Sequence, residues 1–227
     1  MFVGNFEVNK IKPLLEKYIG GLPSTRRVES FKDLNINKIR GNIEKTIYKG
    51  LEDKAVVKLQ FNGDYNNTEE ENVNLDALTE VLEIKLLEKL REEAGGVYSP
   101  NIYSSTQKYP TPIFNLSIDF GCAPANVEKL IKMTLDEIEK IKNTGPEKVD
   151  IEKVIAEEKR STELQFKENG FWNSYLIDQY YKGEDLNFIN RYSKELIDKI
   201  SVESVKKAAN QFCTGNLAKF VLLPEKN

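Results

Sequence analysis

The stretch Phe114-Asn-Leu-Ser-Ile-Asp-Phe120 alternates apolar and polar residues without interruption. Because successive side chains of an extended chain point to opposite faces, this alternation predicts a strand with one buried and one polar face. The next segment, from Asn126 to Asn143, repeats its apolar residues at helical spacing, and Asn126 is placed to cap that helix. A half-buried strand followed by an amphipathic helix predicts a sheet with helices on one face.

Other segments carry strand patterns too. Residues 55–61 alternate apolar and polar side chains, and residues 41–50 show a weaker version of the same pattern. These two segments are expected to form a hairpin that turns at residues 51–54. Residues 217–223 are almost all apolar, which favours a central strand covered on both faces. Phe2-Val-Gly-Asn-Phe6 also reads as a strand.

Leucines at helical spacing predict a long helix over residues 74–93, which Gly95-Gly96 ends. The helix after Asn126 stops at Asn143-Thr-Gly-Pro146, because glycine suits a left-handed cap and proline can start the next helix, over residues 146–167. Shorter helices are predicted over residues 9–19, 171–181, 193–200 and 201–212, the last two with Ser193 and Ser201 as N-caps.

The strands thus come mostly in antiparallel-type pairs, with helices between the pairs. This order predicts an α+β fold: a two-layer sandwich of a mostly antiparallel sheet with helices on one face. The 227 residues suffice for one large domain or two small ones.

The composition argues against several classes of function. The chain has 33 lysines and arginines against 36 aspartates and glutamates, so it lacks the basic footprint of a nucleic-acid-binding protein. No apolar run approaches the roughly 18–20 residues that span a bilayer. The complete absence of histidine excludes Ser-His-Asp and Cys-His catalysis and the histidine-containing zinc helices. No metal site is therefore predicted in this chain.

The cysteines and one acidic run are expected to be structural. Cys122 and Cys213 lie far apart and, without histidine, cannot complete a four-ligand zinc site. They are predicted to be small buried side chains, and nothing in the sequence supports a disulfide between them. Glu69-Glu-Glu71 stands near a helix start, where negative charge complements the helix dipole.

The run Leu90-Arg-Glu-Glu-Ala-Gly-Gly-Val-Tyr-Ser99 is the candidate site. The long helix delivers Arg91 in its last turn, the two glycines break the helix, and a strand is expected from Val97. Arg91 and Tyr98 should therefore lie close together. An arginine fork can hold a substrate carbonyl or carboxylate, and a protonated tyrosine hydroxyl can donate to a developing oxyanion. Residues 98–106 are unusually polar for a strand and suit the wall of a wet cavity.

On the residues alone, a structural interpretation of this run is favoured. Arginine near a helix C-terminus complements the dipole, two glycines form a cap, and tyrosine is common in strands. Five aromatic residues fit either a substrate chamber or, as is more usual at helical spacing, a core: Phe171, Trp172, Tyr175, Tyr180 and Tyr181. Either face of the polar strand could meet a peptide, the one with Asn101, Tyr103 and Ser105 or the one with Tyr98, Pro100, Ile102 and Ser104.

A resemblance changes this weighting. Arg91 and Tyr98, within Leu-Arg-Glu-Glu-Ala-Gly-Gly-Val-Tyr-Ser, resemble the arginine–tyrosine motif in the C-terminal half of insulinase/pitrilysin-type zinc peptidases, the inverzincins. The likeness covers nearly the whole chain. It is closest to the last domain of long bacterial members, and it extends to Phe2–Phe6, Lys12-Pro-Leu-Leu-Glu-Lys-Tyr-Ile-Gly-Gly-Leu-Pro-Ser24, Phe120-Gly-Cys-Ala-Pro-Ala-Asn-Val-Glu-Lys129 and Phe220-Val-Leu-Leu-Pro-Glu225.

In that family two similar halves close like a clamshell, and the N-terminal half holds zinc through H-x-x-E-H and a further glutamate. The resemblance implies that Arg91 binds the substrate backbone and that Tyr98 supports the scissile carbonyl and its tetrahedral intermediate. It implies zinc as the cofactor of the complete enzyme, with none in this chain. The implied partners are a peptide substrate and the zinc-bearing N-terminal half of the same polypeptide. The isolated chain is predicted to be inactive.

Residues 1–227 are accordingly expected to form a single C-terminal domain excised from a longer chain, with Met1 added, because the sequence starts inside an apparent core element. Long relatives of this type are often exported, which suggests the periplasm or cell envelope for the full-length bacterial protein. Two alternatives stay open: a non-catalytic scaffold subunit of the same fold, and a peptide-binding module that uses an exposed strand edge.

Overall fold

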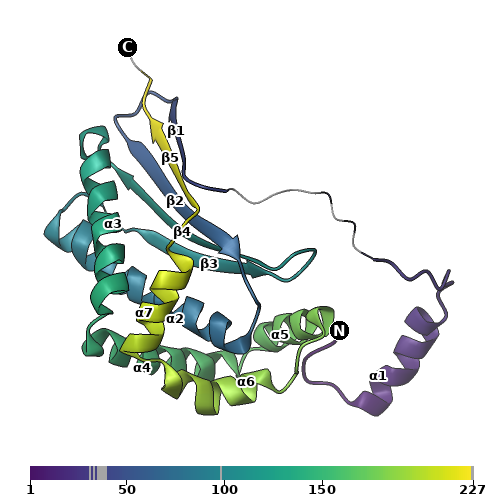
Figure 1. Cartoon of the computed structure of the whole chain (residues 1–227). Helices are drawn as coiled ribbons and strands as arrows, with labels where there is room; N and C mark the ends of the chain where they lie inside the picture. Colours follow the sequence, from purple (N-terminus) through teal and green to yellow (C-terminus); the bar gives the residue numbers. More distant parts are fainter. Residues whose placement is uncertain (31, 33, 35–39, 98, 226–227) are drawn as a thin grey trace.

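The computed structural model describes residues 1–30, 32, 34, 40–97 and 99–225. Within them a five-stranded sheet has the order β1-β5-β2-β4-β3 (Figure 1). Its strands are β1 (Ile43–Tyr48), β2 (Ala55–Asp64), β3 (Asn101–Gln107), β4 (Ile113–Cys122) and β5 (Leu217–Leu223). The β1–β5 pair is parallel and the other three pairs are antiparallel. The predicted α+β class with a mostly antiparallel sheet is confirmed.

The helices of the described residues are α1 (Val8–Leu15), α2 (Glu69–Leu86), α3 (Val127–Thr144), α4 (Lys148–Gln165), α5 (Asn169–Lys182), α6 (Phe188–Arg191) and α7 (Val202–Phe212). Short π-helical turns continue three of them: η1 (Glu16–Gly20) after α1, η2 (Leu87–Glu93) after α2, and η4 (Tyr192–Leu196) after α6. Two 3-10 turns, η3 (Pro124–Asn126) and η5 (Ile197–Lys199), precede α3 and α7.

The core lies between one face of the sheet and the helices α2, α3 and α7. On that face, the inward residues of β2 stand directly opposite those of β4, in the pairs Val57–Phe120, Leu59–Ile118 and Phe61–Leu116. Leu78 and Leu82 of α2 are fully buried in the same core. Burying one such side chain contributes roughly 1.5–3 kcal/mol, so the alternating pattern itself decides which face is covered.

The opposite face of the sheet, called here the open face, presents the other half of each alternation. Its residues include Val56, Lys58 and Gln60 of β2, with Leu222 of β5 beside Val56. Val56 and Leu222 remain 43% and 38% exposed. The predicted helices-on-one-face arrangement is therefore confirmed.

Two predictions were wrong, one about which strands pair and one about how many faces of β5 are covered. Residues 41–50 and 55–61 form no hairpin, because β5 lies between β1 and β2 and pairs with both. The expectation rested on sequence adjacency, which a strand arriving from the C-terminus overrides. β5 is central, as predicted, but it is covered on one face only: Leu222 is exposed on the open face, whereas Val221 is buried.

Two strand boundaries also differ from the prediction. Phe2–Phe6 is not a strand, and both phenylalanines are exposed. The polar strand begins at Asn101 rather than Val97. The preceding Pro100 has no backbone N–H to donate to a strand ladder, so pairing starts after it.

The helix ends show which caps function. α2 starts at Glu69, earlier than predicted, because the Thr68 hydroxyl accepts a hydrogen bond from the Glu71 backbone N–H. Ser201 forms the capping box with Ser204 at the start of α7. Asn126 precedes α3 as expected, but its side chain makes no capping hydrogen bond. Ser193 is not a cap, because it lies inside η4 and the helical run has already begun at Phe188.

The structural expectations for the cysteines and the acidic run are confirmed. Cys122 and Cys213 are both free and buried, and burial raises the pKa of each thiol. Glu69–Glu71 form the first turn of α2. No helix of the described residues is both long and apolar enough to cross a membrane.

Candidate functional site

The candidate site lies where α2 ends and the chain turns toward β3. After η2 the chain reverses in three hydrogen bonds: Gly95 N–H donates to the Arg91 carbonyl over 3.1 Å, and the N–H groups of Gly96 and Val97 each donate to the Leu90 carbonyl over 3.2 Å. Gly95 has φ +60°, a left-handed conformation that glycine adopts without steric cost. The predicted helix-ending glycines are therefore confirmed.

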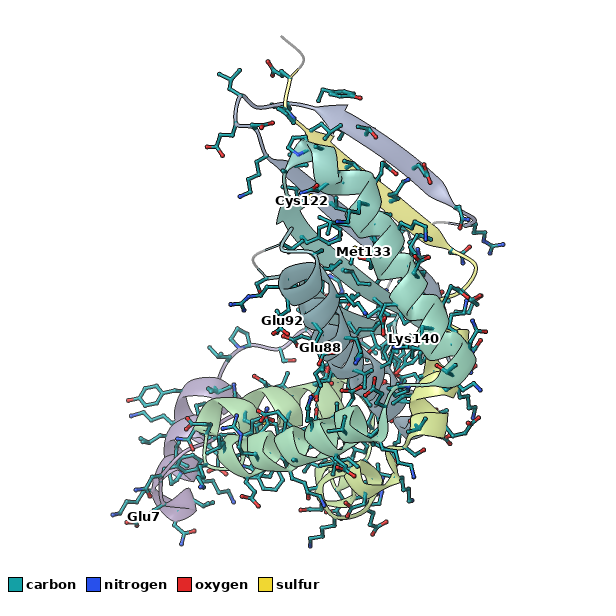
Figure 2. The ribbon with its side chains drawn as sticks, turned by 90° about the vertical axis from the view of Figure 1, so that its left-hand side faces the viewer. Glu7, Glu88, Glu92, Cys122, Met133 and Lys140 are labelled. Atoms are coloured by element: carbon teal, nitrogen blue, oxygen red, sulfur yellow. The ribbon has the colours of Figure 1, made fainter. Side chains whose placement is uncertain are left out.

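Packing fixes this turn against the rest of the molecule. Leu90 is fully buried, so the last helical turn is anchored from inside. A Cβ atom on Gly96 would lie 3.1 Å from both δ-carbons of Leu130, which means that the turn sits directly on α3. Figure 2 shows this end of α2, marked by Glu88 and Glu92, beside α3. The turn is thus a fixed platform for the side chains it carries.

Of the two residues predicted to act here, the structure places one. Arg91 stands on η2 with an exposed side chain, next to the turn. Tyr98 lies outside the described residues, so its proximity to Arg91 stays a prediction.

The polar strand that follows is β3, the outermost strand on one side of the sheet. The sequence did not show which side chains of this strand face the helices. The burial pattern of β3 now shows it. Ile102, Ser104 and Thr106 lie on the helix side, and Ile102 is buried there. Asn101, Tyr103 and Ser105 lie on the open face and are exposed.

A three-residue cluster on the open face was missed by sequence reasoning. The Lys58 ammonium donates to the Tyr103 hydroxyl over 2.6 Å and lies 3.4 Å from a carboxylate oxygen of Asp119. The Tyr103 hydroxyl donates to the same carboxylate over 3.2 Å. The hydrogen bond with Tyr103 and the charge of Asp119 raise the pKa of Lys58, against the opposing effect of burial. Only the strand register brings these residues together, so no local signal could have found them.

The aromatic residues of α5 are not core, which corrects the favoured prediction. Tyr180 and Tyr181 are 80% and 70% exposed. Phe171, Trp172 and Tyr175 are half-buried and form a satellite cluster with ring centroids 5.4–6.2 Å apart. The helical periodicity was real, but α5 packs away from the sheet. Tyr175 instead lines a cavity between α2, α4 and α5.

The described part of the chain offers no ligand set for a catalytic zinc ion. The sequence has no histidine, and no three Asp, Glu or Cys side chains of the described residues are grouped so that they could hold a metal.

The model of the peptidase M16 inactive domain matches residues 1–158, more than half of the sequence. The chain belongs to the peptidase M16 family. The matching family model is that of an inactive domain.

Individual relatives agree with this assignment. The chain is 25% identical over 214 residues to the probable zinc protease PqqL of Haemophilus influenzae, covering 91% of this chain and 23% of that protein. It is 26% identical over 196 residues to the zinc protease PQQL-like protein of Arabidopsis thaliana, covering 79% and 20%. Its fold matches the periplasmic protease PqqL of Escherichia coli with a TM-score of 0.80 at 21% identity, covering 98% and 25%. The chain thus spans about a quarter of these relatives.

Proposed function

We propose that residues 1–227 form a substrate-binding domain of a zinc metalloendopeptidase, whose zinc-bearing half belongs to the same longer polypeptide. The observation that carries this proposal is the position of Arg91: exposed, on a turn fixed by Leu90 and Gly96, at the end of the helix that leads into the outermost strand. Because the chain belongs to a peptidase family, an exposed arginine at this position is suited to binding a peptide substrate.

In this proposal the chain grips the substrate and supports the reacting carbonyl. The Arg91 guanidinium donates to backbone carbonyls of the bound peptide, and its planar fork fixes their orientation. The Tyr98 hydroxyl donates to the scissile carbonyl oxygen, a bond that strengthens as negative charge develops in the tetrahedral intermediate. A zinc ion held by residues of the other half would supply Lewis-acid activation of water. The isolated chain is expected to cleave nothing.

The test uses the complete enzyme with a fluorogenic peptide substrate. Tyr98→Phe and Arg91→Ala are each expected to lower kcat/KM by about 10²–10³, the usual cost of one oxyanion-type donor. The melting temperature of the Arg91→Ala variant should change little, because the Arg91 side chain is exposed. Arg160→Ala is the matched control, since Arg160 is an exposed arginine on α4 paired with Glu157. Unchanged turnover in both site variants would remove Arg91 and Tyr98 from the mechanism.

A non-catalytic role, as a peptide-binding or scaffold domain, is the second candidate, and the edge position of β3 favours the peptide-binding form. An extended peptide can add to a free strand edge through backbone hydrogen bonds. A titration of the isolated chain with a flexible peptide separates the two forms, because a scaffold domain binds none. If the full-length protein lacks hydrolysis but this chain binds peptides, the second candidate replaces the first.

Export to the periplasm or cell envelope is part of the proposal. It is supported by the fold match to a protein described as periplasmic. Cell fractionation of the native host with an antibody against this domain tests it, and recovery in the cytosolic fraction alone would contradict it.

A further inference from the structure

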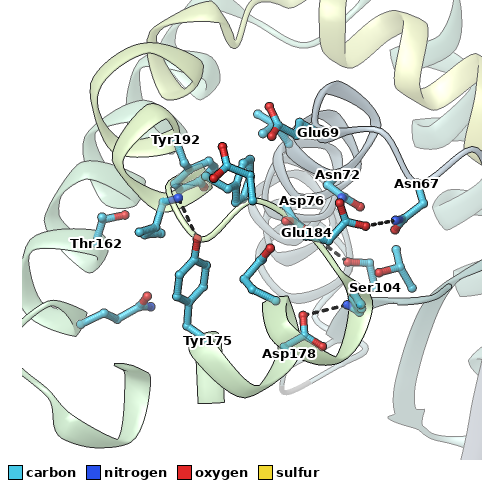
Figure 3. Close-up of a pocket in the computed structure, with 18 of the residues that line it drawn as sticks. Asn67, Glu69, Asn72, Asp76, Ser104, Thr162, Tyr175, Asp178, Glu184 and Tyr192 are labelled. Atoms are coloured by element: carbon cyan, nitrogen blue, oxygen red, sulfur yellow. Dashed lines mark hydrogen bonds and ion pairs between the residues drawn. The ribbon is translucent and has the colours of Figure 1, made fainter. Parts of the chain in front are cut away.

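A cavity of 490 Å³, drawn in close-up in Figure 3, is lined by residues in the first half of α2, at the end of that helix opposite Arg91. Its walls come from α2, β3, α4, α5 and the segment 184–192. Asp76, in its α2 wall, and Arg91 are fifteen residues apart. At about 1.5 Å per helical residue, the cavity is therefore about 22 Å from the turn that carries Arg91. It is separate from the site proposed above.

The cavity is lined by six carboxylic acids and a single lysine. Four of the acids are neutralised by cations of the chain itself: Glu69 and Asp185 by Arg191, Asp178 by Lys182, and Glu184 by Lys108. The two others, Asp76 and Glu158, form no ion pair with any lysine or arginine of the described residues. Uncompensated negative charge is therefore concentrated at these two side chains.

Neutral donors partly satisfy this pair of acids. The Ser104 hydroxyl donates to Asp76 over 3.3 Å, and the Tyr192 hydroxyl donates to Glu158. A third acid, Glu80, lies one helical turn beyond Asp76 on α2, and its side chain is within hydrogen-bonding reach of Glu158. Like charges so close together are unfavourable in the absence of a cation.

The surroundings change how these acids titrate. Solvent reaches Asp76 through the cavity, but the protein around it and the charge of Glu158 raise its pKa to about 6. Burial, the hydrogen bond with Glu158 and the charge of Glu158 raise the pKa of Glu80 much further. At neutral pH, Asp76 is thus mainly ionised whereas Glu80 keeps its proton.

An independent feature of the same cavity is an unsatisfied acceptor. Gln179 of α5 lines the cavity, and its side chain is nine-tenths buried. Its amide oxygen has no hydrogen-bond partner in the structure. Because buried polar atoms are almost always hydrogen-bonded, such an orphan marks a position where a donor belongs.

We propose that this cavity binds an organic cation, a guanidinium or primary alkylammonium group on a flexible chain. Such a group carries several N–H donors, which match the carboxylates of Asp76 and Glu158 and the amide oxygen of Gln179. These acceptors stand on three different helices, so a ligand with spread-out donors suits them better than a compact ion. Tyr175 and Phe188 line the same cavity, which places aromatic rings near the proposed cation.

The cation could be a basic side chain of a peptide or a free polyamine, and the two sources share this chemistry. The inference goes beyond the proposed function and does not depend on it, because binding is measured on this chain without any turnover. The protein can lack peptidase activity and still bind the cation, or have the activity and not bind it, so the two proposals can fail separately.

The experiment is isothermal titration calorimetry of the 227-residue chain at pH 7.5 and low salt, with three probes. They are N-acetyl-arginine amide, the neutral N-acetyl-citrulline amide of nearly the same shape, and spermidine. We expect the arginine probe or spermidine to bind, and citrulline to bind at least about tenfold more weakly, because it lacks the charge. Preference for arginine indicates a peptide side chain, and preference for spermidine a free polyamine.

Variants assign the binding to the cavity. Asp76→Asn and Glu158→Gln should each weaken binding by about ten- to a hundredfold, the usual effect of losing a charge-assisted hydrogen bond. Glu163→Gln, which removes the same charge from an exposed position of α4, should leave binding unchanged. Circular dichroism confirms that each variant is folded. Binding to Gln179→Met, which lacks the orphan oxygen, tests the same site without changing any charge.

Several outcomes would overturn the proposal. They are no heat of binding with either cation, equal binding of citrulline, an equal effect of Glu163→Gln, or saturable binding of Ca²⁺ alone that blocks both organic probes. The last result would make the cavity a metal site instead.

Discussion

The most informative perturbation of the fold is Lys85→Met, in the helix that carries both regions described above. Lys85 is 7% exposed and lies 3.5 Å from Asp150, which is 1% exposed, so the pair joins α2 to α4 inside the protein. Glu88 at 2.8 Å and Glu147 at 3.7 Å also contact the ammonium, but both are partly solvated. Methionine keeps the aliphatic bulk of lysine and removes its charge, which leaves Asp150 buried without its main partner.

The expected cost follows from what remains around Asp150. Breaking a buried ion pair by removing one partner typically costs about 3–5 kcal/mol. Here Lys153 stays 3.8 Å from Asp150 and is half exposed, and the positive end of the α4 dipole lies beside it, so the lower end applies. We expect a loss of about 3 kcal/mol in the free energy of unfolding. For a chain of this length, that lowers the melting temperature by roughly 6–12 °C.

Urea unfolding at pH 7, followed by circular dichroism, measures this loss. Lys132→Met is the matched control, because Lys132 and its partner Asp136 are 75% and 61% exposed on α3 and such pairs contribute less than about 1 kcal/mol. In the double variant Lys85→Met, Asp150→Asn, the orphaned charge is removed and part of the stability should return. The reasoning is refuted if Lys85→Met costs no more than Lys132→Met, or if the two substitutions in the pair are simply additive.

Three smaller effects are expected. Ser201→Ala should lower the free energy of unfolding by about 1 kcal/mol, because it removes the hydroxyl that caps the Ser204 backbone N–H. Urea unfolding measures this loss against Ser204→Ala, which keeps that bond and loses the reciprocal one from the Ser201 N–H. Gly96→Val should lower the melting temperature, because its Cβ would stand 3.1 Å from the Leu130 side chain, and a rescue by Leu130→Ala would confirm the clash. Asp76→Asn should raise the melting temperature above pH 6, since a pKa raised in the folded state makes the ionised form destabilising. This difference from wild type should shrink as the pH falls through about 6 toward 4, and a difference independent of pH would contradict the assignment.

The sequence predicted those parts of the fold that local patterns specify. The alternations at residues 55–61 and 114–120, the apolar stripe of α3 and the Ser201 cap all describe contacts within one element or its immediate flank, and all were found. The partner of β1 could not be predicted in this way. It depends on residues 217–223, which return after more than 160 residues, and adjacency in sequence favoured β2 instead.

The same distinction applies to the candidate sites. The turn after Leu90 was predictable because glycines and a helix end are local signals, and the resemblance gave Arg91 a role. The cavity was missed because Asp76, Glu158 and Gln179 come from three helices whose packing no periodicity specifies. One signal was present: Asp76 and Glu80 are like charges four residues apart on a helix, an unfavourable arrangement that calls for a reason.

The turn and the cavity are connected by β3 as well as by α2. β3 begins at Asn101, shortly after the turn, and its residues Ser104, Ser105 and Thr106 reach the cavity wall. A peptide laid along the outer edge of β3 would therefore lead from one region to the other. At about 3.3 Å per extended residue, the 22 Å that α2 sets between them corresponds to roughly seven residues. If both proposals hold, the enzyme should prefer peptides with a basic side chain about seven residues from the bond held at Arg91. Neither site alone would impose that spacing, so the preference would arise from the rigid helix between them.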